Sequence, residues 1–471
     1  MVLSSLAFLY SFLPLTLLCY YLTPKQHRNL VLFVVSLLFY SWGEPRYVIL
    51  MLYSTVLDYT CGRMIERYRL NPGKARFWLA VSLLGNLGLL GVFKYSDWLL
   101  GNLNQLLSLS LPLPGLRLPI GISFYTFQTM SYSIDVYRGE TPAQRSLIDF
   151  GTYVTLFPQL IAGPIVRYVD VARELTERRH SLDDIGRGAR GFAVGLGKKV
   201  LLANNCGLVF TQIREAMGTG QLSLVGAWLG IIAYALQVYF DFSGYSDMAV
   251  GLGGMFGFSF PQNFNYPFIA RSVTEFWRRW HITLGSWFRD YLYIPLGGNR
   301  RGQLATYRNL LLVWMLTGLW HGAEWNFVWW GGFFAVTLIL ERYRLLNWLQ
   351  RWPRPCQHLY TLALIAVSFA IFAFSSGGEI LSYLASLLGS NRILITNLDL
   401  YLLSSNAALL AAAALAATPL PKLMRERWVV SRAATRTWAA DLAAISWLAL
   451  VLLCTAYLVD SSYNPFLYFR F

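Results

Sequence analysis

The stretch from Asn309 to Leu340 limits what this chain can fold into more than any other. Almost all of its residues are apolar or aromatic, yet His321 and Glu324 lie inside it. A helix crosses the hydrocarbon core of a bilayer with about 20 apolar residues, and an ionisable side chain at that depth must face a polar partner or a water-filled cavity. Because such side chains often mark a reaction or transport path, His321 is the first candidate for catalysis. A histidine that only bonds a neighbouring carbonyl would occupy the same position, and Glu324 either orients the ring or is a solvated residue at a helix end.

The composition indicates a membrane protein throughout. Of the 471 residues, 56% are hydrophobic and 13% are charged, whereas soluble domains have about 25% charged residues. Apolar segments follow one another along the chain, so we expect an all-α polytopic membrane protein with about 11–13 membrane segments, some of them re-entrant. No repeat or linker divides the sequence, which predicts a single domain over residues 1–471.

The basic residues lie mainly in short loops between the apolar segments. This is the pattern of cytoplasmic loops, so the net charge of +15 reflects membrane topology and excludes nucleic acid as the expected partner. Lys25 and Arg28 follow the first apolar segment, and the order of basic loops predicts that both termini lie outside the cytoplasm. The five cysteines are scattered without a CxxC pair, so we expect core thiols and neither disulfides nor a metal site.

Three polar features interrupt the apolar segments. Leu118 to Glu140 mixes Ser, Thr, Gln and Tyr into an apolar background, so it must face other helices or a cavity. Prolines and a glycine within residues 148–166 predict a kinked or re-entrant segment. Asp241 and Asp247 lie in apolar surroundings, where each carboxylate costs free energy unless it is paired.

His180 and Asp184 spell an HxxxD pattern, which occurs in some soluble acyl-CoA-dependent transferases. Here the pattern has a simpler explanation, because Ser181 followed by Asp184 is typical of a helix N-terminus of the capping type. We therefore predict a helix cap at this position and no catalytic role.

The segment from Ser272 to Gly302 alternates basic and aromatic residues. Its spacing predicts an amphipathic helix in the cytoplasmic interface, which would need no further role. The alternative, functional interpretation is that its arginines form an electropositive rim at a tunnel mouth, suited to a phosphate-bearing donor or an acidic carrier. The residues of this rim would be Arg278, Arg279, Arg289, Arg300 and Arg301, with His281 on the same segment.

Several long blocks are more specific than any single motif. They are LPIGISFY from Leu118, DVYRG from Asp135, FPQLIAGPI from Phe157, YFDFSGYSDMA from Tyr239, EFWRRWHI from Glu275, RDYLYIPLGGNR from Arg289, LWHGA from Leu319 and NPFLYF from Asn464. Together these blocks resemble the membrane-bound O-acyltransferase (MBOAT) family, and within it the bacterial members that acetylate alginate or cellulose. The resemblance extends over the whole chain.

The resemblance implies a bundle of tilted helices around a central tunnel, with His321 of the Trp-His-Gly motif as the catalytic residue. His281 matches the second family histidine, and Arg278, Arg279, Arg300 and Arg301 would hold the donor substrate. That donor would be acetyl-CoA or an acetylated carrier, with no permanently bound cofactor. The acceptor would be a periplasmic or membrane-anchored acetyltransferase of an exopolysaccharide secretion complex in the bacterial inner membrane. Sequences of this branch read Phe-Pro-His where this chain has Gln159, so we expect no essential chemistry there.

Two mechanisms and three other functions stay open at this point. A neutral His321 could take the proton of an incoming hydroxyl, or its ring could carry the acetyl group transiently. D-alanyl transfer to teichoic acid is the nearest alternative reaction, because those enzymes share the MBOAT core. A non-enzymatic transport component or a scaffold of the secretion complex would share the membrane architecture.

Overall fold

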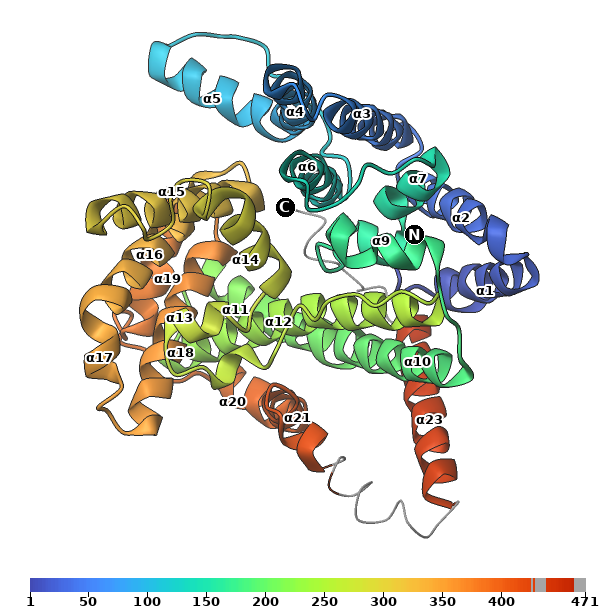
Figure 1. Cartoon of the computed structure of the whole chain (residues 1–471). Coiled ribbons are helices and arrows are strands. Elements are labelled where there is room, and N and C mark those ends of the chain that lie inside the picture. Colours follow the sequence, from blue (N-terminus) through green and yellow to red (C-terminus); the bar gives the residue numbers. More distant parts are fainter. Residues whose placement is uncertain (425–426, 428–437, 461–471) are drawn as a thin grey trace. The chain divides into compact units, whose positions relative to one another are not determined.

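A computed structural model of the chain describes residues 1–424, 427 and 438–460. Every element of this described part is helical (Figure 1), which confirms the predicted all-α class. The motif that begins at Asn464 lies outside the described residues. Two compact units can be distinguished: residues 1–192 with 245–262, and residues 193–244 with the described part of 263–471. This division does not test the prediction of a single domain over residues 1–471.

The first unit contains nine α-helices in its described residues, apart from parts of two longer ones. They are α1 (Leu13–Leu22), α2 (Arg28–Gly43), α3 (Val48–Arg67), α4 (Pro72–Leu90), α5 (Ser96–Leu107), α6 (Ile122–Arg138), α7 (Leu147–Thr155), α8 (Phe157–Leu160) and α9 (Tyr168–Thr176). The break between α7 and α8 agrees with the kinked segment predicted there. The longer helices are α10 (Leu182–Gly197) and α12 (Leu224–Met255), and the boundary between the units falls within both.

Helices α3, α4 and α6 pack against one another around a buried carboxylate. Asp58 of α3 accepts hydrogen bonds from Asn86 Nδ2 of α4 at 2.6 Å and from Ser133 Oγ of α6 at 2.9 Å, and a further bond from Ser82 of α4. These partners satisfy a polar group that would otherwise be costly to bury. Nearly every residue of α6 is buried, so the mixed polar segment faces other helices as predicted.

The second unit contains the remaining helices of the described chain. They are α11 (Asn204–Gly218), α13 (Val273–Trp277), α14 (Ile282–Phe288), α15 (Gln303–His321), α16 (Trp325–Leu340), α17 (Leu346–Leu349), α18 (Arg354–Ala373), α19 (Gly377–Leu387), α20 (Asn397–Ser405), α21 (Ala407–Ala416) and α23 (Trp438–Asp460). Helices α16 and α18 pack together, and α13 contacts both.

The long apolar stretch forms a helical hairpin and not one continuous span. Helix α15 ends at His321, and α16 begins at Trp325. The two helices approach closely at two glycines, because a Cβ atom on Gly318 would collide with the carbonyl oxygen of Phe327, and one on Gly331 with that of Trp314. His321 therefore lies at the end of a helix.

The prediction of one amphipathic helix over Ser272–Gly302 is wrong. The segment is divided into α13, α14 and a π-helical turn (Arg289–Tyr293), and it breaks at His281. His281 has φ 44° and ψ 53°, a left-handed conformation that continues no helix.

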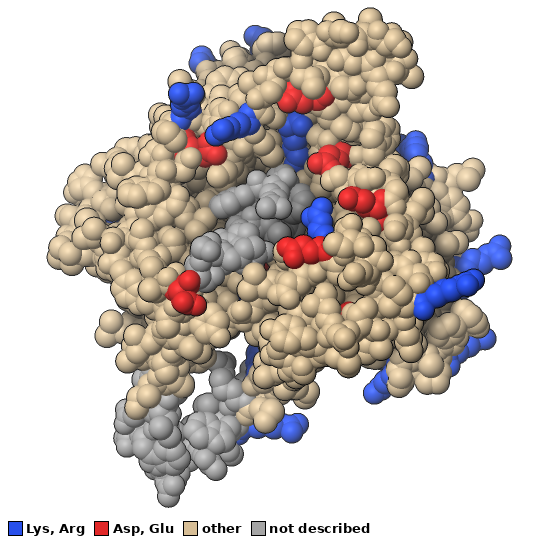
Figure 2. Space-filling view, turned by 180° about the vertical axis from the view of Figure 1, so that it is seen from behind, with Lys and Arg blue, Asp and Glu red and all other residues tan. Residues whose placement is uncertain are grey.

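By length and apolar composition, four helices in the described chain can cross a membrane. They are Val48–Arg67, Pro72–Leu107, Leu224–Met255 and Arg354–Ala373, and α20 with α21 forms a fifth candidate that is bent by 60°. Most of the surface seen in Figure 2 carries neither basic nor acidic side chains. Large apolar side chains such as Leu15, Leu84 and Leu381 are exposed, as contact with lipid requires. The number of 11–13 membrane segments stays a prediction.

Asp241, one of the two aspartates predicted in apolar surroundings, belongs to a buried ion pair. Lys199 Nζ lies 2.7 Å from Asp241 Oδ1, and both side chains are at most 3% exposed. Lys199 Nζ also donates to Asn204 Oδ1 at 2.9 Å. The requirement that Asp241 be paired is thus met, whereas Asp247 is only partly buried.

Two smaller sequence interpretations have different outcomes. Ser181 Oγ accepts the backbone N–H of Asp184 at 3.1 Å at the start of α10, so the predicted helix cap is confirmed. The expectation of five core thiols is correct for Cys61, Cys206 and Cys454 but wrong for Cys19 and Cys356, which are exposed.

Candidate active site

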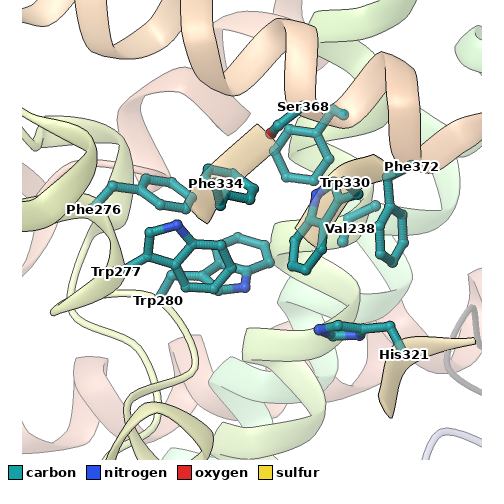
Figure 3. A pocket seen from close by; sticks show the side chains of 10 residues that line it. Val238, Phe276, Trp277, Trp280, His321, Trp330, Phe334, Ser368 and Phe372 are labelled. Carbon is teal, nitrogen blue, oxygen red and sulfur yellow. The ribbon is translucent and has the colours of Figure 1, made fainter. Parts of the chain in front are cut away.

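A small cavity of about 20 Å³ in the second unit has His321 in its wall. Helices α12, α13, α15, α16 and α18 and the turn after α13 supply its lining (Figure 3). The lining residues are Val238, Phe276, Trp277, Trp280, His321, Trp330, Phe334, Ser368, Phe369 and Phe372. Among them only the histidine is ionisable, and apart from Ser368 the other lining residues are apolar or aromatic.

The His321 ring is enclosed by aromatic side chains. Its centroid lies 5.0 Å from that of Trp330 and 5.6 Å from that of Phe372, and both rings meet the imidazole edge to face. Trp320, the preceding residue, has a ring centroid 5.0 Å away. His321 is 3% exposed, so bulk water has little access to the ring.

Glu324 does not orient the His321 ring. Its side chain is exposed and it occupies the position before the first residue of α16. Of the two alternatives for this residue, the solvated carboxylate at a helix end is the correct one.

Trp277 adds a donor to the cavity wall. Its indole Nε1 is buried and has no hydrogen-bond partner among the described residues. A buried N–H group without a partner is unusual in native structures and calls for an explanation. In Figure 3 this nitrogen lies on the side of the ring that faces Phe276.

His281 is buried close to His321 in the same unit. It is 1% exposed, and its ring lies 4.7 Å from Phe242 and 6.0 Å from Trp320 between centroids. Burial lowers the pKa of His281 well below its usual range, and the charge that His321 can carry lowers it further. The two histidines singled out in the sequence thus lie within electrostatic reach of each other.

The four arginines proposed as donor ligands differ in their surroundings. Arg278, Arg300 and Arg301 are exposed. Arg279 is already engaged, because its Nη2 lies 2.8 Å from Glu275 Oε1 and its Nη1 donates to the Asn265 carbonyl at 3.1 Å. The side chains of the other three face solvent, whereas Arg279 stabilises the segment that carries His281. Arg289, the fifth residue of the predicted rim, is exposed and pairs with Asp290 at 2.7 Å.

Gln159 has a structural role in the first unit. It is buried, and its Nε2 donates to the Tyr153 carbonyl at 2.8 Å. The expectation that this position carries no essential chemistry stays a prediction.

Glu341 supports the cavity wall, and sequence reasoning missed it. It follows directly after α16 and is fully buried. Its carboxylate accepts the backbone N–H groups of Val273 and Thr274, each at 2.7 Å, and the Thr274 hydroxyl at 2.6 Å. Glu341 thereby caps α13, the helix that carries Phe276 and Trp277. A lone acidic residue between an apolar run and two arginines was the available sign of this role.

Replacing Glu341 by alanine is expected to lower the free energy of unfolding by about 3 kcal/mol, because hydrogen bonds to a charged group contribute about 1.5–3 kcal/mol each and their loss leaves buried N–H groups unpaired. The measurement is the apparent melting temperature in detergent. Glu379→Ala, which removes an exposed acidic residue from the first turn of α19, serves as the control and should melt like the wild type. Equal melting of both variants would show that the Glu341 cap does not stabilise α13.

Residues 3–386 match the family model described as MBOAT, membrane-bound O-acyltransferase family. The chain belongs to the membrane-bound O-acyltransferase family. The matched residues include both histidines, the four arginines and the whole cavity lining, so the resemblance expected from the sequence blocks is confirmed, and this MBOAT chain is a membrane acyltransferase.

Individual relatives of this MBOAT chain agree with the match. A probable alginate O-acetylase, AlgI, of Azotobacter vinelandii is 44% identical over 79% of this chain and 75% of its own length. A probable alginate O-acetylase, AlgI, of Pseudomonas putida is 40% identical over the full length of both chains. A peptidoglycan O-acetyltransferase of Helicobacter pylori is 34% identical over 83% of this chain and 80% of its own.

Proposed function

We propose that this MBOAT protein takes an acetyl group from a cytoplasmic thioester donor and passes it across the inner membrane for O-acetylation of an exopolysaccharide, alginate or cellulose. The observation that carries the proposal is His321 in the wall of a mainly aromatic cavity of about 20 Å³. A space of that size holds about one water molecule, so it suits a group as small as the methyl of an acetyl unit. The relatives named as alginate and peptidoglycan acetylases support a polysaccharide as the final acceptor.

The reaction that fits the cavity is acyl transfer assisted by one imidazole. A ring nitrogen of His321 takes the proton from an acceptor hydroxyl while the hydroxyl oxygen attacks the thioester carbonyl. The carbon–sulfur bond then breaks, and the leaving thiolate receives the proton from the imidazolium. The indole N–H of Trp277 is a candidate to bind the carbonyl oxygen as negative charge develops on it. The apolar walls disfavour hydrolysis of the donor by excluding water.

A second route has the same reactants and products. The imidazole attacks the thioester first, releases the thiol and carries the acetyl group until the acceptor hydroxyl takes it. Rapid denaturation during turnover distinguishes the two routes, because only this one leaves acetyl on a peptide that contains His321.

The donor and acceptor are assigned to opposite sides of the membrane. Arg278, Arg300 and Arg301 have exposed guanidinium groups that suit the phosphates of acetyl-CoA or the acidic surface of an acetylated carrier. The acceptor is a periplasmic or membrane-anchored acetyltransferase that belongs to a secretion complex, so the polymer never enters this protein. Both termini are proposed to be periplasmic, in agreement with the basic loops.

The test is a transfer assay with the purified protein in nanodiscs. Radiolabelled acetyl-CoA is supplied with a candidate partner acetyltransferase, and both thioester cleavage and label on the partner are measured. We expect cleavage that depends on the partner and label that appears on it. A parallel assay uses a D-alanyl carrier protein as donor and teichoic acid as acceptor. Turnover in that assay and not with the acetyl donor would contradict the proposal. Turnover in neither assay would favour the transport or scaffold alternatives.

A further inference from the structure

One buried amide oxygen gathers the hydrogen bonds around His281. Asn263 Oδ1 accepts the backbone N–H of Thr283 at 3.3 Å and the Thr283 hydroxyl at 2.9 Å, and it lies 3.1 Å from His281 Nδ1. Asn263 and His281 are each 1% exposed and Thr283 is 7% exposed. These bonds lie within the second unit and are shielded from bulk water.

The partners of Asn263 determine which way its amide faces. A backbone N–H only donates, so the atom that faces Thr283 must be the amide oxygen and not the nitrogen. A reversed amide would place the Asn263 Nδ2 donor against the Thr283 donor. Because Oδ1 only accepts, the His281 nitrogen beside it must carry a hydrogen. A neutral imidazole carries one such hydrogen, which leaves Nε2 of His281 with its lone pair.

This arrangement leaves two buried atoms of the same network unsatisfied. Neither His281 Nε2 nor Asn263 Nδ2 has a hydrogen-bond partner among the described residues. Native proteins keep few such atoms, and those that persist often have a functional explanation. His281 also adopts a left-handed backbone conformation, which a residue other than glycine retains only where the surrounding structure enforces it.

The surrounding structure does enforce it. The backbone N–H of Ile282 donates to the Asn263 carbonyl at 2.9 Å, and that of Asn265 donates to the Arg279 carbonyl at 2.9 Å. Two short segments, residues 263–265 and 279–282, are therefore joined on both sides of His281. The ring is fixed by the backbone as well as by the Asn263 side chain.

We propose that Asn263 is a positioning residue that holds His281 as the Nδ1–H tautomer, so that Nε2 accepts a hydrogen bond from an N–H or O–H group of the bound substrate. The inference rests on the proposed transferase function for its substrate, because His281 acts beside His321 in that reaction. The lone pair of His281 Nε2 then accepts its hydrogen bond from the substrate and not from the protein.

The tautomer can be measured without any activity. Only five histidines are present in the chain, so protein labelled with ¹⁵N-histidine gives few signals, and His281→Gln identifies those of residue 281. We expect a protonated Nδ1 and an unprotonated Nε2 for His281 in the wild type at neutral pH. A protonated Nε2 with a bare Nδ1 would overturn the proposal, whatever the behaviour of any variant.

Kinetics then test whether the tautomer matters. Asn263→Ala is expected to lower kcat/KM for acetyl transfer by about 10²-fold, the scale of a misplaced catalytic group, and to give mixed tautomers. Asn263→Asp keeps an acceptor for Nδ1–H and should retain most of the activity. Because a carboxylate raises the pKa of the imidazole, and a protonated Nε2 cannot accept, activity in Asn263→Asp should fall at higher pH than in the wild type as the solution is acidified.

A matched control is Asn205→Ala in the same unit. The Asn205 amide bonds the carbonyls of Val200 and Leu201, and its removal should change neither the tautomer of His281 nor the pH profile. Unchanged kcat/KM and an unchanged tautomer in Asn263→Ala would contradict the positioning role. If the wild type itself transfers no acetyl group, the proposed function fails, and the histidine spectrum alone then decides whether Asn263 sets the tautomer.

Discussion

Replacing His321 by alanine is expected to lower acetyl transfer by about 10²–10⁴-fold, the range that general acid–base catalysis contributes. The ring is the one ionisable group in the cavity lining, so no neighbouring side chain in that wall can take over its proton transfer. Alanine continues α15 to its end without strain, and the protein should still fold. The measurement is label transfer from radiolabelled acetyl-CoA to the partner acetyltransferase.

Two further variants complete that experiment. His27→Ala removes an exposed histidine of the first unit and should have wild-type activity. His321→Gln retains hydrogen-bonding capacity without a titratable group, and it should be as inactive as alanine if proton transfer or acyl transfer by the ring is required. Undiminished turnover in His321→Ala, with a wild-type melting temperature, would contradict catalysis by this residue.

Breaking the pair of Lys199 and Asp241 is expected to destabilise the protein by about 3–5 kcal/mol, because each single replacement removes the opposite charge that lies against a buried charged group. Lys199→Met and Asp241→Leu should each lower the apparent melting temperature strongly. The double variant, with both changes, should recover most of that loss, since an apolar pair of similar size can replace a buried ion pair at little cost.

The control for the ion pair is an exposed one. Arg173 and Glu177 lie 3.8 Å apart, with side chains 83% and 74% exposed, and such pairs contribute about 0–1 kcal/mol. Arg173→Ala should therefore melt close to the wild type. If Lys199→Met behaved like Arg173→Ala, the buried pair would not be a source of stability, and its retention would need another reason.

Features that follow from local composition were predictable from the sequence. The density of apolar residues indicated helices in a membrane, and the polar pattern of residues 118–140 indicated a helix facing others. The burial cost of Asp241 predicted a partner, although not its identity. His321 was identified because burying an ionisable residue in an apolar run costs free energy, and such residues are often functional.

Features that depend on residues far apart in the chain were not predictable in the same way. The carboxylate of Glu341 bonds residues that lie 67 and 68 positions earlier, and no periodicity links these segments. Asn263 lies in a segment with several polar side chains, and the sequence does not indicate which groups its amide bonds. The break at His281 was missed because its sequence keeps an amphipathic spacing, whereas the backbone is set by bonds to residues 263–265.

The Glu341 cap ties the two sides of the cavity together. It joins the beginning of α13 to the residue that follows α16, and both helices contribute rings to the lining. These helices cannot separate to admit a longer acyl chain without giving up buried hydrogen bonds. If the acyl group of the proposed reaction occupies this cavity, rotation or shortening of an individual ring adds room without breaking the Glu341 cap, so the accepted chain length can change in evolution one residue at a time.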